Sequence, residues 1–434
     1  MSTGNLSSLQ RNKHEAPLSK VDIENGQSAT EGQSASSRIR VRDVLILGGL
    51  GALGPLANDM YVPALPALSH DLSATTSQAQ MTLSAFILGL ALGGVIAGPI
   101  SDARGRRWPL LIGVAVYALA SLLSVIVPSI NTLIALRFVQ GIAGAAGIAI
   151  ALAIVSDLYA GIARARFFSL LMQINGLAPM LAPMIGGQLL RFTSWHGVFV
   201  ALTLAGVVLL AASAFGLNET LPASRRQSGG ITSTLAAFRE LLTDRRFVGY
   251  ALSCGFAFTA CIIYISVSPF ILQNIYGVSP QLLGIMFGIN ALGIVIVAQV
   301  NARLIGRVSS QRLLTWGYGM IALGGISLLV VALTGIGLVG ILPAFFVLAS
   351  SLGLIMPNAT TLALSNTRAA GSASALLGVL QLGIGAIVAP LIGLGGSASA
   401  LPMAIAIAAF SIVTLVTFLV LCRPSQIQVR AGID

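Results

Sequence analysis

The sequence contains very little charge for its length. Asp, Glu, Lys and Arg together make up 9% of its 434 residues, whereas soluble domains contain about 25%. Hydrophobic residues make up 56%, and apolar stretches long enough to cross a membrane as helices recur along nearly the whole chain. A membrane β-barrel would instead show segments of about 10 residues with alternating hydrophobicity. The composition excludes a soluble globular protein and predicts an all-α integral membrane protein.

The sequence also lacks the patterns that mark common catalytic and metal sites. It has no CxxC, HExxH, glycine-rich phosphate loop or nucleophile elbow, and its three histidines are not spaced as metal ligands. Cys254 and Cys261 are about 10 Å apart along one helix, too far for a disulfide. We interpret them as packing residues rather than as a redox or metal site. We therefore expect no enzyme activity, no cofactor and no metal.

Twelve apolar runs divide the chain into two sets of six. Residues 1–41 are polar and lack an apolar core, which predicts a disordered tail rather than a signal peptide. Six spans are expected in 42–217 and six more in 247–422, separated by a polar cytoplasmic loop at 218–246 and followed by a tail at 423–434. The expected fold is therefore twelve transmembrane helices in two six-helix, pseudo-symmetric bundles.

Positive charge is distributed very unevenly between the loops. Of 24 Lys and Arg residues, only Arg191 falls in a loop on one side of the expected membrane, and only Arg137 falls inside a span. Positive residues concentrate in cytoplasmic loops, so both termini are predicted to be cytoplasmic. The same distribution accounts for the net charge of +11 without nucleic acid. Weak attraction to anionic lipids is the remaining alternative.

Two pairs of segments indicate that the halves repeat each other. "GLAPMLAPMIGG" from Gly176 and "GIGAIVAPLIGL" from Gly383 share Gly, Ala-Pro, Ile and Gly at the same spacing. "SDARGRR" follows the second span, and "VNARLIGR" follows the eighth. Chance is the alternative, because these residues are common in apolar sequence, but the matches fall at equivalent places in the span order. Parallel halves of this kind are typical of transporters that rock two bundles around a midplane site.

Two charged side chains lie well inside the expected spans, Asp59 in the first and Arg137 in the fourth. Counting along each helix places both in the outer half of the membrane at comparable depth. An ionisable residue inside the membrane is a functional candidate by default. We hypothesise that Asp59 is a proton-coupling carboxylate and that Arg137 controls it by changing its distance. The alternative is a static buried ion pair, which is a poor stabiliser.

A loop motif and a span motif resemble those of the major facilitator superfamily. "GPISDARGRR" resembles the loop signature G-x-x-x-D-x-x-G-R-R/K, with matches at Gly98, Asp102, Gly105, Arg106 and Arg107. Asp157, at the end of the fourth span, is expected either in the same charge cluster or as a solvated end residue. "LRFVQGIAGAAG" resembles the signature around a membrane arginine in proton-coupled members of the superfamily.

Two further motifs favour an antiporter and indicate one branch of this superfamily. "GLAPMLAPMIGGQL" resembles the antiporter signature G-x-x-x-G-P-x-x-G-G at Pro183, Gly186 and Gly187, although alanines replace its first two glycines. Pro179 and Pro183 are expected to bend this helix. "NDMYVPALPAL" together with "LNETLP" resembles the bicyclomycin and chloramphenicol resistance (Bcr/CflA) branch.

The resemblance covers about residues 43–422 and implies the major facilitator fold and a proton-driven, rocker-switch exporter of amphipathic drugs in the bacterial inner membrane. Its expected partners are small amphipathic molecules, protons and the lipid bilayer, without nucleic acid, and we expect a monomer. An exporter of a natural metabolite, such as an amino acid, sugar or siderophore, is the alternative on the same fold. A non-transporting receptor is disfavoured because no soluble sensor domain is visible.

Polar side chains inside the spans are candidate substrate contacts. Because the last six spans contain no charged residue well inside the membrane, we expect the second half to supply shape and polar contacts. A mid-span Asn or Gln is about as often an interhelical hydrogen-bond partner as a ligand contact. Tyr61 is the main aromatic candidate, because it neighbours the acid. The candidates are Asn58, Tyr61, Gln140, Gln173, Tyr264, Ser268, Asn290, Asn358 and Gln381.

Overall fold

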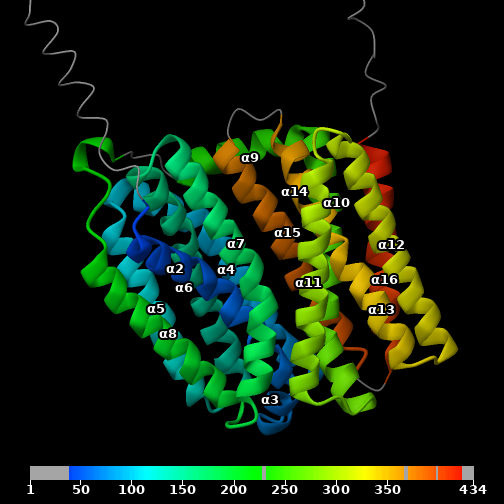
Figure 1. Ribbon diagram of the computed structural model, residues 1–434. Helices are drawn as coiled ribbons and strands as arrows, with labels where there is room; N and C mark the ends of the chain where they lie inside the picture. Colours follow the sequence, from blue (N-terminus) through cyan, green and yellow to red (C-terminus); the bar gives the residue numbers. More distant parts are fainter. Residues whose placement is uncertain (1–38, 227–230, 366–369, 397–398, 423–434) are drawn as a thin grey trace, which may run out of the picture. The chain divides into compact units, whose positions relative to one another are not determined.

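The computed structural model describes residues 39–226, 231–365, 370–396 and 399–422 (Figure 1). The chain divides into two units, Met1–Arg40 and Val41–Asp434, and the description below concerns the second. Within the described residues, twelve helical segments are long and apolar enough to cross a membrane, which confirms the twelve predicted spans and a multi-pass membrane protein. The predicted tails, apart from residues 39–41, lie outside the described residues.

The first six spans form one half of the bundle. They are α2 Val41–Asp59 with the short helices η1 Val62–Ala64 and α3 Leu65–Asp71, then α4 Thr76–Arg104, α5 Arg107–Val125, α6 Ile130–Leu158, α7 Gly161–Leu189 and α8 Trp195–Gly216.

The second half follows a loop that contains η2 Ala223–Arg225 and α9 Ile231–Thr243. Its spans are α10 Arg245–Phe270 with the π-helical turn η3 Ile271–Ile275, then α11 Pro280–Leu304, α12 Ser310–Thr334, α13 Leu338–Ser350 with α14 Leu352–Leu364, α15 Ala370–Gly393 and α16 Leu401–Leu421.

Helix α9 is an addition to the polar loop that the sequence predicted. Phe238 and Leu241 pack against a buried cluster that includes Phe247 of α10 and Leu377 of α15. Their spacing of three residues places both side chains on one face of α9. The helix therefore covers one end of the second half, and the apolar spacing in "FRELL" was the available sequence signal.

Small residues allow the helices within the first half to cross closely. A Cβ atom added to Gly141 of α6 would overlap the backbone carbonyl of Phe86 in α4, and one added to Gly89 of α4 would overlap the carbonyl of Phe138 in α6. Close approach through small residues is how membrane helices gain packing contacts without a hydrophobic driving force. These glycines therefore set the distance between α4 and α6.

The two halves meet along α4 with α15 and along α7 with α11. We call the end of the bundle that holds Val41 and Cys422 the terminal end, and the opposite end, where α3 lies, the far end (Figure 1). The Ser77 hydroxyl donates to the Pro390 carbonyl at 2.8 Å, and Gln273 Nε2 donates to the Pro63 carbonyl at 3.0 Å. Both bonds join the halves near the far end.

We predict that Gly141→Ala destabilises the protein by about 1–3 kcal/mol, because the added Cβ clashes with backbone that cannot rotate away. The measurement is thermal unfolding of the purified protein in detergent. Gly94→Ala is the matched control, since nothing lies within 4 Å of its added Cβ. Equal unfolding temperatures for the two variants would contradict this account of the α4–α6 crossing.

Candidate functional site

The first span is interrupted immediately after Asp59. Helix α2 ends at Asp59, and the chain turns through Met60 and Tyr61 into η1 and α3. Pro63 in η1 lacks the N–H group that would continue the helix. Gly186 of α7 packs against this break, because an added Cβ there would overlap the Met60 carbonyl. The carboxylate therefore stands at a helix end inside the bundle and not on a continuous helix.

Asp59 faces the second half across a small cavity. The cavity has a volume of about 70 Å³ and is lined by Asp59, by Pro179 and Pro183 of α7, and by Tyr264 and Asn290 of the second half. The Asp59 side chain is partly buried and accepts a hydrogen bond from Asn58 Nδ2 at 2.7 Å. The structure thus brings the acid, both antiporter-motif prolines and two of the predicted polar contacts together.

The opposite wall of the cavity is fixed by aromatic packing. Asn290 Nδ2 donates to the Tyr264 hydroxyl at 2.7 Å. The Tyr264 ring packs against Phe345 and Phe287, with centroid distances of 4.5 and 5.1 Å. The hydroxyl–amide pair is therefore held in a defined position opposite the carboxylate, on a wall that is otherwise apolar.

Arg137 lies in the interior of the first half. It has no exposed surface, and it donates to the Ala57 carbonyl at 2.9 Å and to Gln140 Oε1 at 2.6 Å. The centre of its guanidinium group lies 4.3 Å from the Phe86 ring and 4.5 Å from the Tyr61 ring. Cation–π contacts are strongest where the cation is desolvated, as it is here. Aromatic faces and two acceptors together hold the buried charge.

Asp59 and Arg137 do not form an ion pair in this structure. The ion pairs within 4.0 Å among the described residues involve Asp43, Asp102 and Asp157, and none involves Asp59. Arg137 instead binds the carbonyl of Ala57, which is one of the last four carbonyls of α2 and lacks an intrahelical partner. The arginine therefore caps the helix end that carries Asp59, and the static ion pair that was the alternative interpretation is not the arrangement observed.

Two predicted contacts lie elsewhere for a clear physical reason. Tyr61 is fully buried, packs beneath Arg137, and shares a hydrogen bond of 2.6 Å with Thr82. Gln140 is also fully buried and donates to the Ser121 hydroxyl at 2.7 Å. Both satisfy the buried arginine network of the first half, so neither lines the cavity.

The remaining candidates are dispersed over the molecule. Gln173 is exposed on α7, and Ser268 is fully buried on α10. Asn358 donates to Asn301 Oδ1 at 2.6 Å, and Gln381 donates to Cys254 Sγ at 3.0 Å. The last two are interhelical hydrogen-bond partners of the second half. None of the four lines the cavity beside Asp59.

The loop motif forms a charge cluster at the terminal end. Arg106 donates to Asp157 at 3.0 Å, to Ser101 at 2.8 Å, and to Asp102. The structure thus places Asp157 in the cluster with the loop motif. Asp102 thus pairs with an arginine of its own half. The cluster ties the end of α4 to the end of α6.

Glu219 is a member of this cluster that sequence reasoning missed. Its carboxylate accepts from the backbone N–H groups of Arg106 at 2.8 Å, Arg107 at 3.3 Å and Leu221 at 3.0 Å. Partial burial raises the pKa of Glu219, but these N–H donors outweigh burial, so the pKa lies below its ordinary value. Gly105 has φ +93°, and an added Cβ would overlap Glu219. The acidic residue in "LNETLP" was the available sequence signal, but this segment was interpreted only as a motif of the Bcr/CflA branch.

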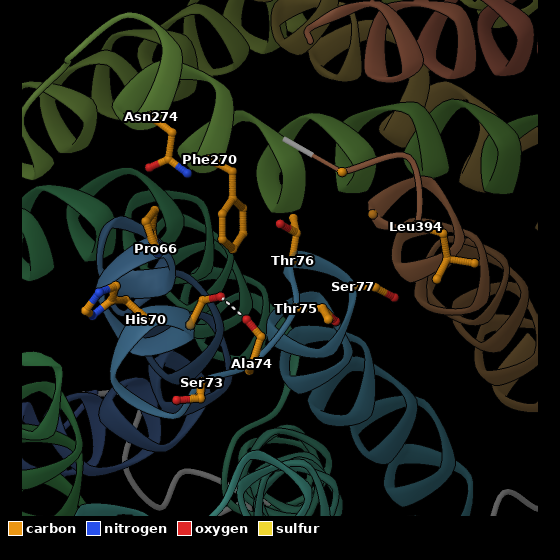
Figure 2. Close-up of a pocket in the computed structure, with 13 residues that line it drawn as sticks. Pro66, His70, Ser73, Ala74, Thr75, Thr76, Ser77, Phe270, Asn274 and Leu394 are labelled. Carbon is orange, nitrogen blue, oxygen red and sulfur yellow. Dashed lines mark hydrogen bonds between the residues drawn. The ribbon is translucent and has the colours of Figure 1, made fainter. Parts of the chain in front are cut away.

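A larger cavity lies at the far end, between α3 and α4 of one half and η3 and α15 of the other. It has a volume of about 850 Å³, and Figure 2 shows His70, Thr76 and Ser77 along it with Phe270 and Asn274. Because Ser77 lines this cavity and donates to Pro390, the bond between the halves lies at its edge.

Comparison with known proteins agrees with this architecture. A family model described as "Major Facilitator Superfamily" matches residues 47–390. A Bacillus subtilis protein described as an uncharacterized MFS-type transporter, YdgK, is 41% identical over 84% of this chain and 91% of its own. A Haemophilus influenzae bicyclomycin resistance protein homolog is 30% identical over 86% of this chain and 94% of its own. The crystal structure of the nucleoside transporter NupG matches with a TM-score of 0.72 at 13% identity, covering 87% of this chain and 99% of that one.

We predict that Glu219→Gln lowers the unfolding temperature at neutral pH and has no effect in acid. A carboxyl with a depressed pKa stabilises the folded state above its ordinary value of 4.5, and this stabilisation is lost as the pH falls through the lower folded pKa. The unfolding temperatures of the two proteins should differ from pH 7 to about pH 5 and converge below it. A pH-independent difference would show that Glu219 acts only through packing.

Proposed function

Because this chain belongs to the Major Facilitator Superfamily and, with its relatives, to the Bcr/CflA type of drug transporter, we propose that it exports antibiotics and other amphipathic drugs in exchange for protons. The observation that carries the proposal is Asp59, which stands at an interrupted helix and faces a cavity between the two halves. A carboxylate at such a position can meet a proton from one side and a substrate from the other.

The cavity walls favour an amphipathic substrate, and the cavity of about 70 Å³ must widen when a drug-sized molecule binds. Tyr264, Phe287 and Pro183 supply mostly apolar surface, whereas Asp59 and Asn290 supply a negative charge and an amide. A cationic drug gains from the carboxylate, and a neutral one needs only the apolar walls. The relative described as a bicyclomycin resistance protein homolog supports a drug over a natural metabolite. A resistance panel in an efflux-deficient host, compared with metabolite levels in the medium, separates these two substrates.

The charge distribution supports a cytoplasmic terminal end, and the relatives from Haemophilus and Klebsiella support a location in the bacterial inner membrane. The loops at this end carry the arginines of the "SDARGRR" motif, as the positive-inside rule requires. With this orientation the far end is the periplasmic side, and the contacts of Ser77 and Gln273 close it.

Proton coupling follows from how α2 ends. Its last carbonyls give this helix end a partial negative charge, which disfavours an ionised carboxylate at Asp59. Arg137 counteracts that field through the Ala57 carbonyl. Both helices belong to the first half, so the mechanism requires α2 to shift against α6 within that half as the two halves rock, which moves the arginine relative to the acid. When Arg137 approaches Asp59, the carboxyl group releases its proton more readily. When Arg137 withdraws, the carboxylate takes up a proton more readily.

We predict that Asp59→Asn abolishes drug-driven proton release in inverted membrane vesicles, because the amide cannot exchange a proton. Fluorescence of a pH-sensitive dye on addition of drug is the measurement, together with drug uptake under an imposed pH gradient. Asp71→Asn is the matched control, since an amide oxygen can still accept the 2.9 Å hydrogen bond from the Trp195 indole.

Retained coupling in the Asp59→Asn variant would refute the role of this residue. Loss of coupling in both variants would show a general requirement for charge in the first span. If the unaltered protein transports no drug and exports a metabolite instead, the proposed substrate class is refuted. The test of proton coupling at Asp59 then still applies, with that metabolite as the substrate.

Where α4 and α15 meet at the far end, a polar side chain is buried without a hydrogen-bond partner among the described residues. Gln80 of α4 has no exposed surface, and neither its Nε2 nor its Oε1 has a hydrogen-bond partner among the described residues. It packs against Gly393 of α15, whose added Cβ would overlap its amide. Each unpaired buried polar atom costs about 1–3 kcal/mol. Opening of the far end would hydrate this amide, so Gln80 favours opening.

We predict that Gln80→Leu shifts the protein towards the state with a closed far end, by about five-fold or more in population. Spin labels at the exposed Ser73 and Ser399 report the distance across the far end in lipid nanodiscs. Met81→Leu, on the neighbouring lipid-exposed position, should leave the distance distribution unchanged. A shift towards longer distances in Gln80→Leu would contradict this account of the far-end contact.

A further inference from the structure

An apolar groove runs along the outer surface of the first half between α4, α5 and α6. It has a volume of about 360 Å³. Helices α4 and α5 both pack on α6 but make much less contact with each other, so α6 forms the floor of the groove. Small side chains create the space, among them Ala97, Ala143 and Ala146. Apart from Arg104 and Trp108 at one end, the other side chains in the groove are aliphatic, as an acyl chain requires.

The lining residues form one stripe on each helix. On α4 the stripe runs from Gly93 to Arg104 at helical spacing, and it spans about 16 Å along the axis. A single leaflet of the hydrocarbon core is about half of 30 Å. The groove therefore reaches from the terminal-end surface of the membrane to its middle, which matches the depth of one acyl chain.

The terminal end of the groove is polar and positively charged. Arg104 is in the last turn of α4 and Trp108 is in the first turn of α5, and both line the groove. Arg104 is exposed, and none of the ion pairs among the described residues includes it. The Trp108 side chain is 69% exposed. Trp and Arg at this depth are the residues that contact lipid headgroups.

We propose that this groove binds one anionic glycerophospholipid of the leaflet at the terminal end. One acyl chain occupies the groove between Ala97, Ile112 and Ala146, and the headgroup phosphate binds the Arg104 guanidinium. Charge complementarity selects the headgroup, because every glycerophospholipid offers a phosphate to Arg104 but a zwitterionic one also brings its own cation close to the guanidinium. The lipid would also sit next to the loop of Arg106. This proposal rests on the membrane location of the chain and not on the proposed substrate.

The test uses native mass spectrometry of the full-length protein titrated with phosphatidylglycerol and, separately, with phosphatidylcholine. The unaltered protein should retain one phosphatidylglycerol more tightly than phosphatidylcholine. Arg104→Gln should weaken phosphatidylglycerol binding about five-fold and phosphatidylcholine binding by less, so that the preference for phosphatidylglycerol falls. Arg303→Gln is the matched control, because Arg303 is exposed and holds the corresponding position of "VNARLIGR" in the second half.

A second variant tests the acyl-chain part of the groove. Ala146→Leu adds volume to the floor and should reduce retention of both lipids while Arg104 stays in place. Thermal unfolding of each variant confirms that it is folded, and Arg104→Gln alone still decides the headgroup contact if Ala146→Leu does not fold.

Three results would overturn the proposal. Unchanged phosphatidylglycerol binding in Arg104→Gln would show that the guanidinium does not hold the headgroup. Equal weakening in Arg104→Gln and Arg303→Gln would show general attraction of anionic lipid to basic loops. A dimer in the lipid-free spectra that Ala146→Leu disrupts would show that a second copy of the chain covers the groove.

Discussion

The hydrogen bond from Arg137 to the Ala57 carbonyl is the interaction on which the candidate site depends. A membrane interior offers no water to the backbone, so a helix can end there only where protein groups satisfy its last carbonyls. The first span ends its regular helix at Asp59, and the buried arginine supplies one of the missing donors. Without that donor, an interruption at this depth would leave an unpaired carbonyl, and the acid would be less stably placed at a helix end.

The sequence predicted the twelve spans and singled out the two charges inside them, because hydrophobic length and isolated charge are properties of the chain itself. It did not predict how the two charges are arranged. Depth along each helix placed Asp59 and Arg137 at a similar level, but helix rotation decides whether they meet. Rotation depends on packing, here on the aromatic rings of Phe86 and Tyr61 around the guanidinium. A hydropathy pattern does not contain that information.

The predicted polar contacts separate for the same reason. Tyr264 and Asn290 face the cavity, whereas Gln140 and Tyr61 face the interior of the first half. All four are polar or aromatic residues in the middle of a span, so composition and spacing treat them alike. What distinguishes them is the cost of burying Arg137, which requires acceptors and aromatic faces nearby. Polar and aromatic residues beside a buried charge therefore interact with that charge and are not available to contact a substrate.

The two halves use the repeated loop motif in different chemical forms. Asp102 of the first half corresponds to Asn301 of the second, and the ion pairs among the described residues all lie in the first half. Asn301 instead accepts a neutral hydrogen bond from Asn358. Neutral bonds do not respond to protonation of a carboxylate, whereas ionic ones do. Under the proposed function, the asymmetry confines the proton-sensitive ionic bonds among the described residues to the first half, whereas the corresponding bond of the second half is neutral.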